Sequence, residues 1–168
     1  MPSPDRIVIN TGPLIALVAG LGSLELLRDM YKEVIVPAEV ALEIGALKTS
    51  QFVQPEFEAG RSWLAVVASP VHLPSWLRSS LDPGEASVIQ TAEDKKISTV
   101  VIDEAAGRRV ASLCGLKVTG SVGILLRAKA EGRLPSVKHV LNAMKSNGVW
   151  LGSQVLRQAL RLAGEPEE

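Results

Sequence analysis

Short apolar runs alternate with longer stretches of helical periodicity along most of this chain. Five runs are expected to form buried strands, at residues 6–10, 33–36, 64–67, 97–102 and 116–119. Helices are expected between and after them, at residues 13–19, 23–30, 37–43, 56–60, 83–94, 104–114, 121–132, 135–146 and 153–163. This alternation is typical of an α/β fold, in which helices cover a parallel sheet.

Turn and cap residues mark the boundaries of these elements. Thr11-Gly12 is expected to form the turn out of the first strand, and residues 45–55 to form a loop. Residues 70–82 are expected to form a second loop that contains about one helical turn. Asp82 is a good N-cap, and Glu85 stands three positions later, so a well-capped helix should begin here.

The composition agrees with this interpretation. Hydrophobic residues make up 46% of the 168 residues and aromatic residues only 4%, as in a sheet core of Val, Ile, Leu and Ala. We expect a single domain over residues 1–168, with residues 164–168 frayed. The formal net charge is zero, which argues against bulk electrostatic binding of nucleic acid but allows a local basic rim.

Compartment signals are few. Cys114 is the one cysteine, so no intramolecular disulfide can form, and no Cys/His cluster suggests zinc. The longest apolar run, residues 13–22, is too short and too interrupted by glycine to cross a bilayer. No signal peptide is evident, so we expect a cytoplasmic protein without membrane contact.

Carboxylates stand where strands and loops give way to helices. Asp103 ends the fourth strand, Glu85 opens a helix, and Glu43 lies on the helix after the second strand. Asn10 occupies the corresponding position after the first strand. Because the ends of parallel strands converge on one edge, the three acids should meet there and repel each other unless a divalent cation lies between them. The pattern therefore predicts a metal site in which one ligand position is altered.

Several motifs together resemble the PIN-domain family of metal-dependent nucleases, especially its VapC-like toxin branch. In chain order they are residues 8–17, Val36-Pro37 followed by Glu43, residues 81–86, Ile102-Asp103-Glu104 with residues 108–111, and residues 118–129. The resemblance implies a PIN-like three-layer α/β/α sandwich with a central, mostly parallel sheet of about five strands. It also implies an acidic pocket that binds Mg²⁺ or Mn²⁺ and cuts RNA.

The resemblance also assigns positions in the pocket. Its four ligand and catalytic positions fall on Asn10, Glu43, Glu85 and Asp103. Thr11 matches a hydroxyl residue that orients a water or ligand. Carboxylates holding one or two divalent ions can activate water and stabilise charge on a phosphodiester. We expect Asp103 and Glu85 to be the principal ligands and Glu43 to be a ligand or the base.

Substrate contacts are less clearly marked. Ser121 lies at a helix start that borders the pocket in relatives, and Arg108, Arg109 and Lys129 are candidate phosphate contacts. Alternatively, the two arginines are simply solvated on a helix surface and contact no phosphate. The three tryptophans could stack on bases or pack in the core or an interface.

The first functional hypothesis is a Mg²⁺- or Mn²⁺-dependent endoribonuclease, the toxin of a toxin–antitoxin pair. Such a protein would act on RNA, be inhibited by a small antitoxin protein and form a homodimer through its helices. Asn10 and the zero net charge motivate an alternative, a degenerate PIN domain that binds RNA or protein without cutting. A third possibility is an α/β domain in which the acids serve only as helix caps.

Overall fold

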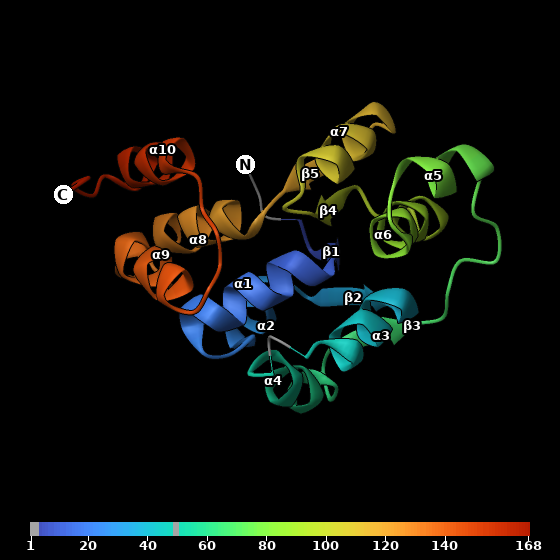
Figure 1. Ribbon diagram of the computed structural model, residues 1–168, viewed down its shortest axis with the longest axis horizontal. Coiled ribbons are helices and arrows are strands. Elements are labelled where there is room, and N and C mark those ends of the chain that lie inside the picture. Colours follow the sequence, from blue (N-terminus) through green and yellow to red (C-terminus); the bar gives the residue numbers. More distant parts are fainter. Residues whose placement is uncertain (1–3, 49–50) are drawn as a thin grey trace.

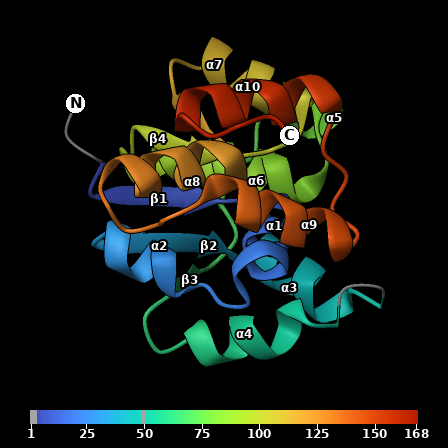
Figure 2. The same ribbon diagram turned by 90° about the vertical axis from the view of Figure 1, so that its left-hand side faces the viewer.

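A computed structural model describes residues 4–48 and 51–168. Within them, five parallel strands form one sheet in the order β3-β2-β1-β4-β5. Figure 2 shows β4, β1, β2 and β3 one above another. The strands are β1 (Arg6–Ile9), β2 (Glu33–Pro37), β3 (Ala65–Val67), β4 (Thr99–Val101) and β5 (Lys117–Thr119).

Helices cover both faces of this sheet. In chain order, the first five helices are α1 (Thr11–Leu21), α2 (Glu25–Met30), α3 (Ala38–Ala46), α4 (Val53–Gly60) and α5 (Ser75–Ser80). The helices that follow are α6 (Pro83–Asp94), α7 (Ala105–Leu113), α8 (Ser121–Ala130), α9 (Val137–Ser146) and α10 (Ser153–Ala163). Helices α6 and α7 lie on one face, and α1 packs with α8 and α9 on the other (Figure 1). The predicted three-layer α/β/α sandwich is confirmed.

The central strands are buried on both sides. Ile7, Val8 and Ile9 have no exposed surface, and Val8 stands in register with Ile35 on one side and Val100 on the other. A strand with helices on both faces must be apolar at every position, which explains its continuous apolar run.

The strand order reverses direction between β1 and β4. Their carboxyl ends are joined by a hydrogen bond of 3.0 Å from the Asn10 backbone N–H to the Val101 carbonyl. Ligands of open parallel sheets bind at such a switch point, outside the carboxyl ends of the strands. The fold therefore brings the residues that follow β1 and β4 together.

Two predicted boundaries are wrong. Thr11 and Gly12 do not form a turn but are the first residues of α1, because Asn10 is still extended and the helix begins directly after it. Residues 45–55 are not one loop, since α3 runs to Ala46 and α4 begins at Val53; residues 49 and 50 lie outside the described part. Val53 and Phe57 are buried and hold α4 to the core, and a proline is tolerated in its first turn.

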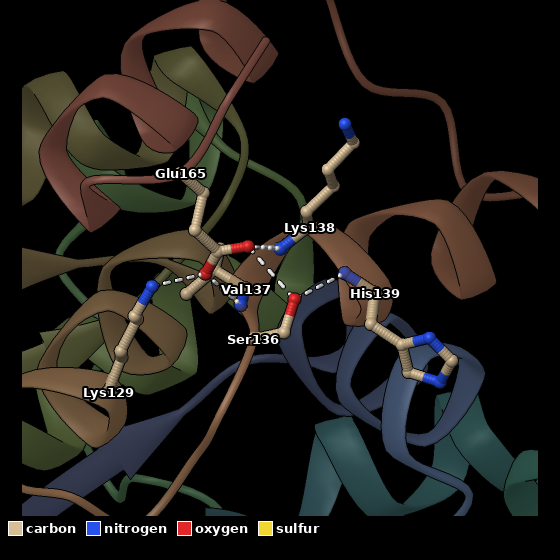
Figure 3. A network of polar contacts seen from close by, with 6 residues as sticks. All are labelled: Lys129, Ser136, Val137, Lys138, His139 and Glu165. Carbon is tan, nitrogen blue, oxygen red and sulfur yellow. Dashed lines mark hydrogen bonds and ion pairs between the residues drawn. The ribbon is translucent and has the colours of Figure 1, made fainter. Parts of the chain in front are cut away.

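Glu165, near the carboxyl end, is bound to the fold by several hydrogen bonds. Its Oε1 accepts hydrogen bonds of 2.6 Å from both Lys129 Nζ and the Val137 N–H (Figure 3). Its Oε2 accepts bonds of 2.9 Å from Ser136 Oγ and 3.0 Å from the Lys138 N–H. The carboxylate thus caps the amino end of α9, where unpaired amides favour a negative charge.

Burial opposes the ionisation of Glu165, but these donors outweigh it. Bonds from Lys129, from the Lys138 and Val137 amides and from Ser136 lower the pKa of Glu165 to about 2. Glu165 therefore fastens the end of α10 to α8 and α9. Among the described residues, no helix is both long and apolar enough to cross a membrane.

We expect Glu165→Gln to lower the free energy of unfolding by about 1–3 kcal/mol at neutral pH, because a neutral amide satisfies fewer of these charged and amide donors. Since the folded-state pKa is depressed, the stabilisation is present above the ordinary value of 4.5 and is lost as the pH falls toward about 2. Urea denaturation across this pH range measures it.

Glu167→Gln is the matched control. Glu167 pairs with the exposed Arg161 at 3.5 Å, so its loss should cost less than about 0.5 kcal/mol. Equal effects of the two substitutions would contradict the anchoring role of Glu165.

Candidate functional site

The residues predicted to form a site lie where helices begin at the carboxyl edge of the sheet. Helices α1, α7 and α8 start directly after β1, β4 and β5, and α3 starts after β2. The amino end of a helix carries unpaired N–H groups and a partial positive charge, which favours anionic side chains and ligands. The backbone thus prepares this edge for negative charge.

Thr11 and Glu43 join the first two of these helices. Thr11 Oγ1 donates a hydrogen bond of 2.5 Å to Glu43 Oε2, which fixes the carboxylate of α3 against the start of α1. The neighbouring Asn10 side chain is 4% exposed, and its Oδ1 has no hydrogen-bond partner within the described chain. A buried amide oxygen without a partner is costly and indicates a missing donor or cation.

Asp103 follows β4 and is held by Ser121 at the start of α8. Its Oδ1 accepts a 2.7 Å hydrogen bond from the Ser121 N–H, and its Oδ2 accepts one of 2.9 Å from Ser121 Oγ. Burial of the carboxylate nevertheless raises the pKa of Asp103, although the Ser121 bonds and the charge of Arg108 lower it. Ser121 therefore positions Asp103, while Arg108 donates at 2.9 Å to the Ile102 carbonyl beside it.

Glu85 lies in the first turn of α6 and is 5% exposed. Burial, together with the negative charges of Asp82 and Glu104, raises the pKa of its carboxyl to about 7. Asp82 is the predicted N-cap and accepts a 2.8 Å hydrogen bond from the Glu85 N–H. At neutral pH, Glu85 is therefore poised between its charged and neutral forms.

Glu104 is a member of the acidic group that the sequence analysis missed. It is the N-cap of α7, and burial raises the pKa of its carboxyl. The charges of Asp103, Asp82 and Glu43 raise that pKa further, so these carboxylates share one electrostatic environment. Its place directly after Asp103, at a predicted helix start, was the available signal.

Glycines make room for four of these carboxylates. In each case a methyl group on the glycine, which lies at the start of a neighbouring helix, would come close to a carboxylate oxygen. The pairs are Gly12 with Glu104 at 3.4 Å, Gly84 with Glu43, Gly107 with Glu85 at 3.0 Å and Gly120 with Asp103 at 2.6 Å. Because the glycines have no side chain, each acid can lie directly against the amide groups of a helix start.

The remaining predicted residues have different surroundings. Arg108 lines a cleft of about 750 Å³ together with Asp103, Glu104 and Ser121. Arg109 is exposed on α7, outside the set of residues that line this cleft. Lys129 does not join the acidic group, because its Nζ is paired with Glu165 at 2.6 Å. Of the predicted cations, Arg108 is the one that the structure places beside the acids.

The donors present are suited to a hard divalent cation. They are carboxylate oxygens with raised pKa values and one amide oxygen without a partner, which Mg²⁺ and Mn²⁺ accept as ligands. Among residues 4–48 and 51–168, however, no three His, Cys, Asp or Glu side chains lie close enough together to hold a metal ion. The residues therefore fit a divalent cation in the type and charge of their donor atoms, and not in a closed ligand geometry.

A comparison with protein families agrees with the fold. A family model described as a PIN domain matches residues 6–165, nearly the whole chain. The chain therefore belongs to the PIN-domain family, which has a nuclease-type fold. No protein of curated function matches the chain.

The close approach at Gly84 can be tested by substitution. Alanine in a helix interior is normally more stable than glycine by about 0.5–1 kcal/mol. We expect Gly84→Ala to destabilise the protein instead, because its methyl group would overlap Glu43 Oε1. Gly45→Ala is the control, since a methyl group at Gly45 on α3 meets no described atom within 4 Å. Urea denaturation should show a lower free energy of unfolding for Gly84→Ala and a higher one for Gly45→Ala. Stabilisation by both substitutions would contradict the close packing of Gly84 against Glu43.

The raised pKa of Glu85 predicts a pH-dependent stability in the metal-free protein. Because its folded-state pKa is about 7, above the ordinary 4.5, its contribution is fully present below 4.5 and is lost as the pH rises through 7. With EDTA, Glu85→Gln should therefore be more stable than wild type by roughly 1–3 kcal/mol at about pH 8 and equal to it below about pH 4.5.

Glu25→Gln controls for the loss of a first-turn charge. Glu25 is exposed in the first turn of α2, so its removal should change the free energy of unfolding by less than about 0.5 kcal/mol at either pH. A Glu85→Gln variant that is no more stable than wild type at alkaline pH would contradict the buried, repelled carboxyl.

Proposed function

We propose that this protein is a Mg²⁺- or Mn²⁺-dependent endoribonuclease. The observation that carries the proposal is the group formed by Glu43, Glu85, Asp103 and Glu104 at the carboxyl edge of the sheet. Burial raises the pKa of Glu85, Asp103 and Glu104, and the negative charges of neighbouring carboxylates also raise the pKa of Glu85 and Glu104. The acidic residues are therefore not fully neutralised by the side chains around them. A fold does not accumulate such charge without cost, and a bound divalent cation is the usual compensation.

Asp103, Glu85 and the Asn10 amide oxygen would hold the cation. When bound, the ion stabilises negative charge on the phosphate oxygens and lowers the pKa of water. Ser121 keeps the Asp103 carboxylate oriented through two hydrogen bonds. Hydrogen bonds of this kind, from a neighbouring residue to a ligand side chain, orient the ligands in metal sites.

Glu43 is the proposed general base. Thr11 holds its Oε2 at 2.5 Å, so the carboxylate has a fixed orientation. It takes a proton from the attacking water as the water oxygen bonds to phosphorus, and the opposite phosphorus–oxygen bond breaks. The leaving oxygen then takes a proton from solvent. Arg108, beside Asp103 in the cleft, supplies a positive charge for the phosphate.

The biological role that we propose is the toxin of a toxin–antitoxin pair. A small antitoxin would cover the acidic cleft, and helices would form a homodimer. Exposed apolar side chains on α10, Val155 at 47% and Leu162 at 68%, support a protein contact on this helix. Expression of wild type, but not of an inactive variant, should then slow the growth of a host cell.

A PIN domain that binds without cutting is the second candidate. Asn10 favours it, because an amide supplies no negative charge where an acid would complete the set. The absence of a closed group of three metal-binding side chains in the described residues points the same way. Metal binding and cleavage therefore have to be measured separately.

Asp103→Asn should reduce RNA cleavage by at least about 100-fold while the fold is retained. The amide keeps an acceptor for the Ser121 N–H but loses the charge that attracts a cation. Cleavage of a labelled single-stranded RNA in Mn²⁺ measures the effect. Asp29→Asn, an exposed residue of α2, makes the same chemical change elsewhere and should cleave like wild type. Equal cleavage by Asp103→Asn and wild type would refute the assignment.

Asn10→Asp should strengthen Mn²⁺ binding by about 5- to 100-fold, because a further charge in a partly screened pocket contributes about 1–3 kcal/mol. In EDTA the same variant should be less stable than wild type, since a buried charge is added without a partner. Calorimetric titration measures the affinity for Mn²⁺, and thermal unfolding in EDTA measures the loss of stability. Tighter binding without any cleavage would favour the second candidate, and unchanged binding would place Asn10 outside the metal site.

A further inference from the structure

Trp150 is a large apolar side chain that the fold leaves outside its core. It is 87% exposed and lies between α9 and α10. An indole exposed to this degree contributes little to folding, so its position calls for another explanation. Trp150 also lines the cleft of about 750 Å³ that contains Asp103, Arg108 and Ser121.

The segment that carries Trp150 is held from both sides. Val149 and Leu151 pack against the core, so Trp150 between them points outward. The Val149 N–H donates to the Met144 carbonyl at 3.0 Å, and Asn147 Nδ2 donates to the Ala19 carbonyl at 2.8 Å. The indole is thus presented from a segment that is fixed before any ligand binds.

The indole also rests against its own backbone. A methyl group on Gly152 would lie 3.5 Å from Trp150 Cη2, so the ring lies close over this glycine. Gly152 lines the same cleft, which places the ring at the wall of the cleft. Most of the indole surface nevertheless stays exposed.

We propose that Trp150 is the base-stacking platform of a single-stranded RNA subsite in this cleft. The inference rests on the proposed ribonuclease function and adds how the substrate is held. The cleft has the size of a small-ligand pocket, which suits an unstacked nucleotide better than a duplex. Asp103 at one part of its lining belongs to the acidic group, and Arg108 offers a charge to a phosphate. A nucleotide adjacent to the cleaved phosphate can then place its base on the indole.

Binding can be measured without cleavage by keeping the protein in EDTA at low salt. The probe is a short single-stranded RNA of mixed sequence labelled with fluorescein, and its anisotropy reports the dissociation constant. Trp150→Ala should weaken binding by about 5- to 100-fold, the range that one stacked base contributes. Trp150→Phe should recover most of the affinity, because it keeps an aromatic face. Thermal unfolding verifies that both variants are folded.

Trp76→Ala is the matched control. Trp76 is 53% exposed on α5 and is not among the residues that line the cleft, so its loss should leave binding unchanged. A fully paired RNA duplex is the second control. Its bases are already stacked on each other, so Trp150→Ala should have little effect on its affinity.

Each contrary result identifies what has failed. Wild-type affinity of folded Trp150→Ala for single-stranded RNA overturns the subsite. A loss of self-association in that variant, with RNA binding unchanged, overturns it in favour of a protein contact. If wild type binds and cleaves but Trp150→Ala is unaffected, the subsite alone is wrong. If wild type binds through Trp150 but never cleaves in Mn²⁺, the ribonuclease function fails and the subsite stands. No binding by wild type overturns the subsite, and the cleavage assay in Mn²⁺ then decides the ribonuclease function separately.

Discussion

Repulsion between carboxylates at the carboxyl edge of the sheet is the constraint on which the site depends. Asp103 and Glu104 lie at the junction between β4 and α7, and Glu85 lies in the first turn of α6. The fold brings Glu85 and Glu104 close enough for their charges to interact. Ser121 holds Asp103, and glycines leave room for all three acids. Burial still raises the pKa of each acid, and like charge also raises the pKa of Glu85 and Glu104. These properties support the proposal that the edge binds a cation, which would then position a phosphate.

Glu165 shows what a satisfied carboxylate looks like in the same molecule. Both Glu165 and Glu85 lie at the amino end of a helix and are mostly buried. Four donors lower the pKa of Glu165 to about 2, whereas burial and the negative charge of Asp82 raise that of Glu85 to about 7. The first residue stabilises the fold by fastening α10, and the second has a cost that the fold alone does not explain. The comparison distinguishes an acid whose charge the fold stabilises from one whose charge the fold opposes.

The sequence predicted the strands and the acids that follow them because both depend on local patterns. Continuous apolar runs marked β1 and β4, and Asp82 with Glu85 marked the start of α6 correctly. The start of α1 was placed too late, because Thr11 and Gly12 are typical turn residues and tertiary packing decided otherwise. Glu104 and the partner of Lys129 were missed since both depend on contacts between distant segments. Which glycine lies against which carboxylate is also a property of packing.

Linkage between metal binding and folding tests the central claim most directly. Thermal unfolding would be followed during titration with Mn²⁺ at about pH 8, where Glu85 is mostly charged, and at about pH 5, where Glu85 is protonated. The account predicts a saturable rise in stability at the higher pH, about 2.7 kcal/mol at a hundredfold excess over the dissociation constant, and a much weaker response at the lower pH. A folded protein that shows no saturable response at either pH would contradict the claim that this acidic edge is built for a cation.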